Sequence, residues 1–501
     1  MKPTPGDIYC VYHPLLQQYV ACQITALKDK NMVAVLDLDW CGASLPDAAA
    51  LAAMRPLVCD YYFWRGRYDH SFLPASVPPH YTLVGNVPPL VNEEVNSYAG
   101  GWNVGNSLYN QRHWNAIDAD KRARFKAASR DRQVTLPAGV LPENTTKITD
   151  THLAGLTDYA LLDQLPCLTT VETAQGSEAL AAYLHQHPFI MELHWASSAG
   201  MTALDLSGSP LKRLIIDPTG LTSLRVNDGL NLLSLSATPA PDLTIHSRHQ
   251  GRDLTLMHGQ TLPSLQGLDA LRGLHLTQVA QADIAAIADR FPALAQLRLW
   301  GKPGVLIHMD SLARLSALQM FTTVDLFGFA PEDVPSPEAL PHMAMLWMTS
   351  LPADVATSVK KRWKKVDGVD LSITKPRKPE WLAENLTNPF RDWDGRENIS
   401  PAHAKKAAAL YKQACISLRE INGSSDAASV NATAETLVRS WAEAFNAMDR
   451  RSSSIETIER EEIADVIYGL LCQMEQQLGQ DASERFDKHA MMDLFDRLRD
   501  F

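Results

Sequence analysis

The amino-acid sequence predicts a multidomain α+β protein in which a repetitive solenoid lies between an N-terminal small β-barrel and a C-terminal helical bundle. Three observations predict this class: strand-like segments near the start, Leu-x-x-Leu-x-Leu hexads through the middle third, and amphipathic helical segments near the end. With 501 residues, 46% of them hydrophobic, the chain is long enough for about three cores. We expect the barrel over 1–90, a connecting segment over 91–150, the repeats over 151–375, a linker over 376–399 and a four-helix bundle over 400–501.

The start of the chain alternates strand-like runs with turn residues. These runs are rich in Val, Ile and aromatic side chains, which favour strands, and they cover Asp7–His13, Gln18–Ala26, Met32–Trp40 and Leu57–Trp64. Short strands of this kind are typical of a small SH3-like β-barrel. The run Pro5–Val11 (PGDIYCV) resembles the first strand of small barrels in bacterial toxin-immunity families. That resemblance implies an alternative function, an immunity or defence factor that neutralises a toxin.

The middle of the chain repeats a pair of apolar residues two positions apart. Successive pairs start 19 to 27 residues apart, which is the period of leucine-rich repeats. In strands of this kind the paired residues point inward, and the residue between them points outward. The pairs are Leu193/Trp195, Leu214/Ile216, Leu233/Leu235, Leu254/Leu256, Leu274/Leu276, Leu297/Leu299, Val324/Leu326, Leu346/Met348 and Val369/Leu371.

The segment 190–372 resembles bacterial leucine-rich-repeat proteins through these pairs. The resemblance implies a solenoid whose stacked repeats share a core and present a broad sheet for binding. Further pairs halfway between the early ones, such as Leu204/Leu206, predict a second strand in each early repeat, and Asp283–Phe291 predicts a helix in a later one. The family usually has Asn three residues after the last strand leucine. Here those positions hold Thr219, Thr238, Val279 and Lys302, so the array is degenerate.

The last hundred residues have the pattern of four amphipathic helices joined by short polar loops. Ser400 can cap the first helix, with Pro401 at its first position, and Ser453 with Glu456 forms a capping-box pattern before the third. An antiparallel bundle is the expected arrangement. Glu459 and Glu462 lie on neighbouring helical turns, but no Glu-x-x-His motif accompanies them. We therefore expect a solvated acidic face and no metal site.

Composition restricts the function classes. The net charge of −11 disfavours nucleic acid as a general partner. The seven cysteines are widely spaced without a Cys-x-x-Cys pair, so neither a zinc site nor a disulfide framework is indicated. The opening has no signal-peptide run, and no apolar stretch approaches ~18 residues. We expect a cytoplasmic protein without a membrane segment, a cofactor or a metal.

One enzyme class has a similar architecture. Secreted bacterial ubiquitin ligases also carry a helical domain after a leucine-rich array, and they use a Cys-x-Asp nucleophile in it. The candidates here read Cys415-Ile416-Ser417 and Cys472-Gln473-Met474, so the Asp is missing from both. Both cysteines also fall near apolar helix sides, where burial raises a thiol pKa. This ligase-type effector is a disfavoured alternative, and we expect no catalytic activity.

The predicted outward strand positions are the candidate binding site. Aromatic side chains beside an arginine are the usual composition of an interface hot spot, and they gather in the last repeats. The candidate binding residues are His275, Arg298, Trp300, Asp325, Phe327 and Trp347. The equally weighted alternative is that an insert or the C-terminal domain covers this patch. We expect the basic cluster within 360–378 to be a solvated helix end, with binding of an acidic partner surface or of nucleic acid as the alternative.

The sequence thus predicts a non-catalytic scaffold that binds another protein through the outward face of a leucine-rich-repeat sheet. It does not identify the partner, the oligomeric state or the pathway.

Overall fold

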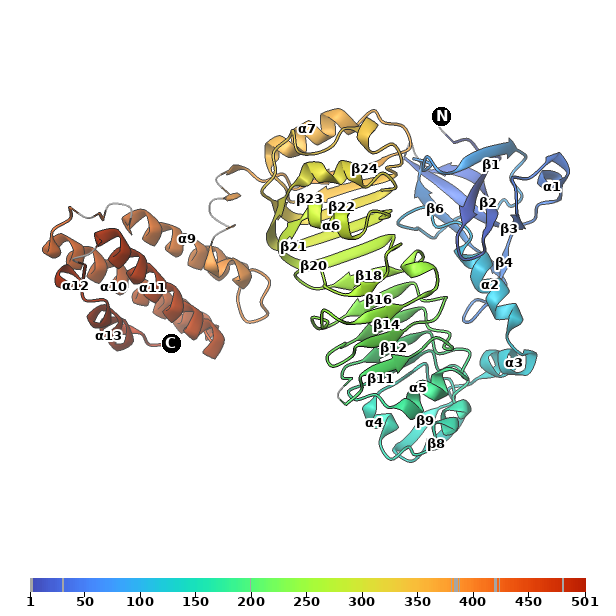
Figure 1. Ribbon diagram of the computed structural model, residues 1–501, viewed down its shortest axis with the longest axis horizontal. Helices are drawn as coiled ribbons and strands as arrows, with labels where there is room; N and C mark the ends of the chain where they lie inside the picture. Colours follow the sequence, from blue (N-terminus) through green and yellow to red (C-terminus); the bar gives the residue numbers. More distant parts are fainter. Residues whose placement is uncertain are drawn as a thin grey trace. The chain divides into compact units, whose positions relative to one another are not determined.

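The chain is α+β, and its large central sheet differs from the predicted fold. The computed structural model (Figure 1) describes residues 3–28, 31–198, 200–379, 381–382, 386, 388–418, 421–422, 424–479 and 482–501. The central sheet has 11 parallel strands and is not a leucine-rich-repeat solenoid, so the predicted fold class was wrong. Chain contacts divide the protein into two compact units, Met1–Pro376 and Arg377–Phe501, which are described separately.

The N-terminal segment forms an antiparallel sheet. Its five strands are ordered β6-β3-β2-β1-β7, an open order, where the sequence predicts a barrel. The strands are β1 (Asp7–His13), β2 (Gln18–Lys28), β3 (Met32–Gly42), β6 (His70–Pro74) and β7 (Thr82–Asn86). One face packs on α1 (Ala48–Ala53) and the other on α2 (Asn106–Ala116) and α3 (Ala119–Ala127), because apolar side chains from alternate strand positions cover both faces. The predicted strand Leu57–Trp64 is reduced to β4 (Val58–Cys59), which pairs with β5 (Arg67–Tyr68).

The central sheet has the order β10-β11-β12-β14-β16-β18-β20-β21-β22-β23-β24. Its strands are β10 (Lys147–Ile148), β11 (Thr170–Thr173), β12 (Glu192–Trp195), β14 (Arg213–Ile216), β16 (Leu232–Leu235), β18 (Thr255–His258), β20 (Gly273–Asp283), β21 (Gln296–Ile307), β22 (Met320–Phe327), β23 (Met345–Thr349) and β24 (Asp370–Thr374). All neighbouring pairs are parallel. The shorter strands alternate between a buried and a half-exposed side chain, as expected for a sheet with one covered face.

The core lies behind this sheet, on the side where the leucine pairs point. In the early part, β13 (Ala203–Asp205), β15 (Ser223–Arg225), β17 (Thr244–His246) and β19 (Gln266–Gly267) form a second parallel sheet over it. In the later part, α6 (Ile284–Arg290) and α7 (Ala353–Trp363) take over this role, as Ile284, Ile287, Val355 and Val359 are buried. The apolar pairs predict only which strand face is buried. They carry no information on what covers that face, and for this reason the fold class could not be read from them.

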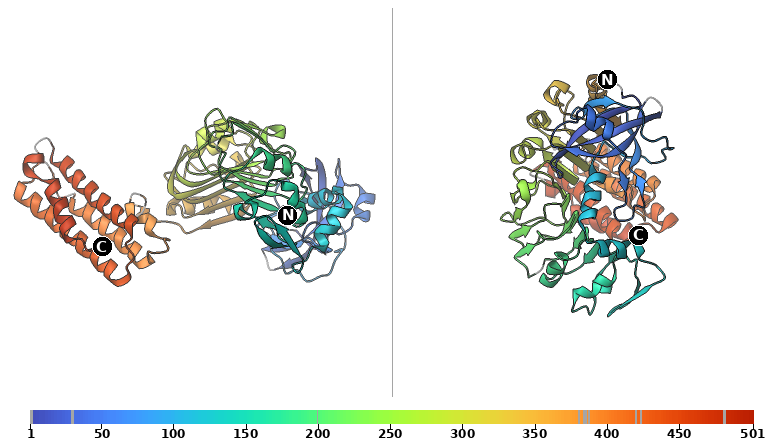
Figure 2. Two further views of the ribbon diagram at one scale, coloured as in Figure 1. Left: turned by 90° about the horizontal axis from the view of Figure 1, so that it is seen from below. Right: turned by 90° about the vertical axis from the view of Figure 1, so that its right-hand side faces the viewer.

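The remaining elements of this unit are short. They comprise β8 (Gln133–Leu136), β9 (Gly139–Pro142), α4 (Asp150–Leu153), α5 (Glu178–Leu184) and the 3-10 turns η1 (Tyr159–Gln164), η2 (Arg248–Gly251), η3 (Met309–Arg314) and η4 (Pro337–Ala339). Both views of Figure 2 show the N-terminal sheet in blue against the central sheet in green to yellow.

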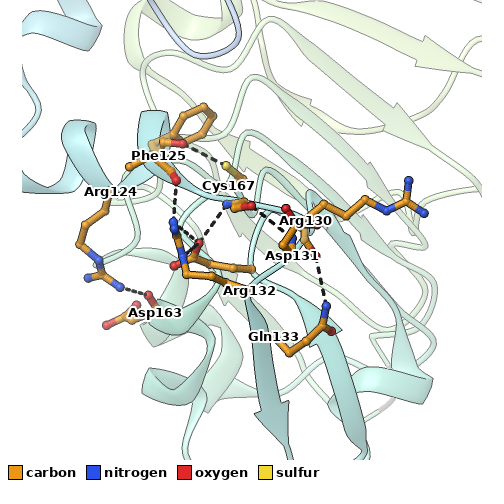
Figure 3. Close-up of polar contacts among 11 residues, drawn as sticks. Arg124, Phe125, Arg130, Asp131, Arg132, Gln133, Asp163 and Cys167 are labelled. Atoms are coloured by element: carbon orange, nitrogen blue, oxygen red, sulfur yellow. Dashed lines mark hydrogen bonds and ion pairs between the residues drawn. The ribbon is translucent and has the colours of Figure 1, made fainter.

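Helix α3 and the segment after it form a group of polar contacts with the chain before β11 (Figure 3). Arg124 donates to the backbone oxygen of Asp163 at 2.7 Å, and the Cys167 thiol donates to the Phe125 oxygen at 3.3 Å. Arg132 donates to Glu143 at 2.7 Å and to the Ala127 oxygen at 2.5 Å. Burial raises the pKa of the Cys167 thiol to about 11. These contacts tie α3 to η1 and to the loop before β11.

The C-terminal unit is helical. It contains η5 (Pro389–Trp393), α9 (Pro401–Leu418), α10 (Ala427–Ser452), α11 (Thr457–Leu478), α12 (Ala482–Arg485) and α13 (Lys488–Leu498). Its core includes the rings of Phe390, Trp393, Trp441 and Phe445, which meet in tilted and edge-to-face contacts. The predicted linker 376–399 lies partly outside the described residues.

The acidic face predicted for the third helix was wrong at one position. Glu459 is only 3% exposed and pairs with Arg396 at 2.6 Å, and Arg396 also pairs with Glu462 at 2.6 Å. The helix begins at Thr457, so its capping box joins Glu456 with Glu459, while Ser453 ends α10. Sequence spacing could not reveal this ion pair, because Arg396 lies some sixty positions earlier in the chain. Within the described part of the chain, none of the helices has the length and apolar character needed to cross a membrane.

Candidate functional site

The outward face of the central sheet is defined by strand register. Leu297 and Leu299 of β21 stand opposite Phe321 and Thr323 of β22. Phe321 and Thr323 therefore fill the inward positions that the sequence assigned to Val324 and Leu326. Val324 is half-exposed, whereas Leu326 is buried further along β22. Thr323 is only 2% exposed although it is polar, which explains why a search for apolar pairs missed this register.

A cleft of about 600 Å³ opens on the outward face at the β21–β24 end. Its floor comprises Gln296, Arg298, Trp300, Gln319, Met320, Thr322, Thr323, Val324, Ala344, Met345, Trp347, Thr349 and Asp370. Its wall comprises Pro74, Ser76, Pro78, His80, Gly100, Gly101, Trp102 and Asn103, from the end of β6 and from loops of the N-terminal segment. We call this feature the aromatic cleft, after Trp300 and Trp347 on the floor and Trp102 in the wall.

Two tryptophans on the floor are held by specific neighbours. Trp300 is 42% exposed, and its ring meets the His275 ring edge-to-face at a centroid distance of 4.3 Å. Trp347 is half-buried, and its Nε1 donates to Asp370 Oδ2 at 3.2 Å. Burial raises the pKa of Asp370, and the Trp347 hydrogen bond partly opposes this shift. Both rings are therefore positioned by contacts and still line an open hollow.

His275 is nearly buried beside this floor. Its residue is 8% exposed, and burial, followed by the charge of Arg298, lowers its pKa to about 4. Its Nε2 is buried without a hydrogen-bond partner among the described residues. The imidazole is therefore neutral at pH 7 and supplies an uncharged edge to Trp300.

The wall comes close to β23 and to the turn before β24. A Cβ built on Gly101 would lie 3.5 Å from Met345 Cε, and one built on Gly368 would lie 3.0 Å from the Val77 oxygen. Trp102 Nε1 donates to the Pro74 oxygen at 3.0 Å, and the Tyr81 hydroxyl donates to the Trp102 oxygen at 3.1 Å. The two segments of the wall are thus hydrogen-bonded to each other.

A buried carboxyl group supports the wall from behind. Asp37 Oδ2 accepts the backbone N–H of Gly105 at 3.0 Å, at the start of α2. Burial, followed by the neighbouring Asp69, raises the pKa of Asp37 to about 8. Gly105 has φ of 91°, and a Cβ there would lie 2.7 Å from a methyl group of Val20, so only glycine fits. The contacts of Gly105 with Asp37 and Val20 thus position the chain between Asn103 of the wall and the start of α2.

The structure brings together four of the six candidate binding residues. His275, Arg298, Trp300 and Trp347 lie on neighbouring strands of the outward face. The other two, Asp325 and Phe327, do not join them, because β22 bends after Val324.

The bend explains both misplaced residues. Asp325 has a left-handed φ of 52°, and the pairing between β21 and β22 shifts between Trp300 and Gly304. Past this shift Phe327 is turned into the interior and is 1% exposed. A period-two pattern cannot anticipate a bend that reverses the sides of a strand.

The cleft also contains residues that sequence reasoning missed. Asp370 begins β24, and the wall comes partly from the end of the predicted barrel and partly from the segment predicted to connect that barrel to the repeats. One available signal was the Gly100-Gly101-Trp102 run. Glycines have no side chain, so a pair of them next to a tryptophan can indicate a place where the backbone packs closely against another part of the protein. Nothing in the local sequence, however, indicates which strand that loop approaches.

The opposite end of the same face is charged rather than aromatic. Lys147 pairs with Glu172 at 2.7 Å, His194 pairs with Glu172 at 3.3 Å and with Glu192 at 2.7 Å, and Arg213 lies 3.6 Å from Glu192. We call these five residues the charged ladder. Its members satisfy one another across four neighbouring strands.

The other hollows of the described structure have fewer features of a binding site than the aromatic cleft. One of about 460 Å³ lies between α5 and the second sheet and is lined by residues such as His185, Asp205 and Arg225, with no Phe, Tyr or Trp among its described lining. Among the described residues, no three His, Cys, Asp or Glu side chains gather where they could hold a metal ion. Comparison with protein-family models and with curated proteins gave no match to this chain. The aromatic cleft is therefore the candidate functional site.

Proposed function

We propose that this protein is a non-catalytic binding protein that seats a segment of another protein in the aromatic cleft. The observation that carries this proposal is an exposed Trp300 and a half-buried Trp347 on the floor of a hollow of about 600 Å³. That volume is typical of binding sites, which hold roughly 300–1,000 Å³. Indole rings and guanidinium groups also contribute most to interface hot spots.

A peptide segment fits the chemistry of the floor. Gln296, Gln319, Thr322 and Thr349 line it with amide and hydroxyl groups. Such groups both donate and accept hydrogen bonds, so they can satisfy the N–H and C=O groups of an entering backbone. The aromatic rings between them offer apolar surface for alternate side chains of that segment.

The first test removes the aromatic floor. Trp300→Ala combined with Trp347→Ala should weaken partner binding by on the order of 2 kcal/mol or more, which is about 30-fold. The measurement is quantitative capture from native lysate on the tagged full-length chain, with mass spectrometry. Proteins retained by the wild type should be lost from the double variant.

Two controls accompany this test. Tyr12→Ala removes a ring that is 50% exposed outside the aromatic cleft, and it should leave capture unchanged. Trp300→Ala alone spares the Trp347 bond to Asp370 and should keep a normal melting curve. Equal capture by the wild type and a normally melting double variant would overturn the proposal.

The cytoplasm is the compartment that we propose for this activity. Its support is that all seven cysteines are free thiols in the structure, whereas secreted proteins usually pair theirs in disulfides.

A further inference from the structure

Arg298 differs from the other outward arginine on this sheet face in having no counter-charge. Its side chain is half-buried on the floor of the aromatic cleft. Among the residues that the structure describes, it has neither an ion pair nor a side-chain hydrogen bond. Arg213, at the other end of the face, is more exposed and lies 3.6 Å from Glu192.

The immediate neighbours of Arg298 are uncharged. His275 stands opposite it on β20, and Thr322 stands opposite it on β22. His275 stays neutral at pH 7, because burial and the charge of Arg298 lower its pKa. A half-buried guanidinium with neutral neighbours favours an anion from outside the chain, since its five donors remain to be satisfied.

Asp370 is the carboxyl group on the floor, but it lies at the far side. It begins β24, three strands beyond β21. With neighbouring strands about 4.8 Å apart, three spacings amount to about 14 Å. The Asp370 side chain also accepts the indole N–H of Trp347. It is therefore too distant to neutralise Arg298, and about four extended residues would span the two groups.

We propose that Arg298 receives a carboxylate of the bound segment, so that the aromatic cleft selects acidic peptides. This inference rests on the proposed function and names the chemistry of its ligand. A guanidinium binds a carboxylate through two parallel N–H···O hydrogen bonds, which are shorter and stronger than neutral ones. The carboxylate can come from an Asp or Glu side chain or from the C-terminus of the partner.

The test uses two pools of random twelve-residue peptides on beads, probed with the labelled full-length chain. Peptides of the first pool are attached through their C-terminus, so only side chains supply carboxylates. Peptides of the second pool are attached through their N-terminus and keep a free C-terminal carboxylate. The variants are Arg298→Gln, Arg298→Lys, Trp300→Ala and, as a matched control, Arg213→Gln.

We expect Asp and Glu to be enriched among bound peptides of the first pool, or binding to be confined to the second pool. The first result identifies a side-chain carboxylate and the second a C-terminal one. For a selected peptide, changing the carboxylate to an amide should weaken binding at least tenfold. Arg298→Gln should abolish this preference, Arg298→Lys should retain part of it, and Arg213→Gln should leave it unchanged.

The outcomes distinguish a failure of this inference from a failure of the proposed function. Peptides that depend on Trp300 but show no acidic preference, or that bind Arg298→Gln equally well, would overturn the inference and leave the proposed function standing. If no peptide of either pool binds in a Trp300-dependent manner, the proposed function itself is overturned, and the inference with it.

Discussion

At the β10–β14 end of the central sheet, outward charges pair with one another across neighbouring strands, as Lys147 does with Glu172. At the β20–β24 end, outward positions carry the rings of Trp300 and Trp347 and the uncompensated Arg298. Both ends have the same backbone arrangement and the same buried inward face. The two ends differ in whether the outward side chains find their interaction partners within the chain. The charged ladder is satisfied within the chain, whereas the aromatic cleft has polar and apolar groups that a partner can satisfy.

The two ends of the sheet are described as sharing one inward core. Substitutions in that core should have the largest effect on the free energy of unfolding, and they test this description. Leu214→Asp and Leu297→Asp each place a carboxylate at a position that is 0% exposed, one at each end. Their cross-strand neighbours are apolar, so each should cost several kcal/mol of unfolding free energy. Denaturant unfolding measures this loss.

A matched substitution at an outward position serves as the control. Thr255→Asp lies on β18 between the two ends, and its side chain is half-exposed. It should leave the unfolding free energy nearly unchanged. If either leucine variant were as stable as this control, the inward face described here would be wrong at that end.

The pH dependence of stability tests the difference between the two ends at His275 of the outward face. His275 has a folded pKa of about 4, lowered by burial and by Arg298, while the unfolded chain takes up this proton near 6.5. The unfolded state therefore binds more protons in this window, and the stability contributed by neutral His275 is lost as pH falls from about 6.5 to 4.

Urea unfolding of the wild type and of His275→Gln at several pH values measures this effect. The variant should lose less stability than the wild type between pH 6.5 and 4. His194→Gln, in the charged ladder, is the matched control at the other end. An equal acid loss in wild type and His275→Gln would show that this imidazole is not buried as described.

The smallest effect is expected in the charged ladder. Glu192→Gln removes the charge that pairs with His194 and Arg213, all of which are 30–49% exposed at their side chains. Exposed ion pairs contribute ~0.2–1 kcal/mol, so the unfolding free energy should fall by less than about 1 kcal/mol. Capture of partners on the full-length chain should not change. A clear loss of capture with normal unfolding would move the binding site to this end.

Much of the local structure could be predicted from residue patterns. The pairs Leu193/Trp195 and Leu346/Met348 lie inward on β12 and β23, as their period of two indicates. The helix expected over Asp283–Phe291 forms as α6, capped by Asp283. These features depend on neighbours within a few positions, so they are encoded locally.

The candidate site could be predicted only in part. Arg298, Trp300 and Trp347 follow from strand alternation alone. Phe327 was misplaced, because Thr323 fills an inward position and β22 bends at the following residues. The wall was missed altogether, since it reaches the sheet from some two hundred positions earlier in the chain.

In elements such as β12, β23 and α6, the sequence by itself determined which side chains are buried, because that choice follows from the spacing of apolar residues along one element. Only the tertiary structure decided that the strands form one parallel sheet of 11, that loops around Trp102 stand over its β21–β24 end, and that Glu459 is buried against Arg396. Each of these outcomes depends on contacts between residues far apart in the chain. A local pattern says that a face must be covered, and the packing of distant segments decides what covers it.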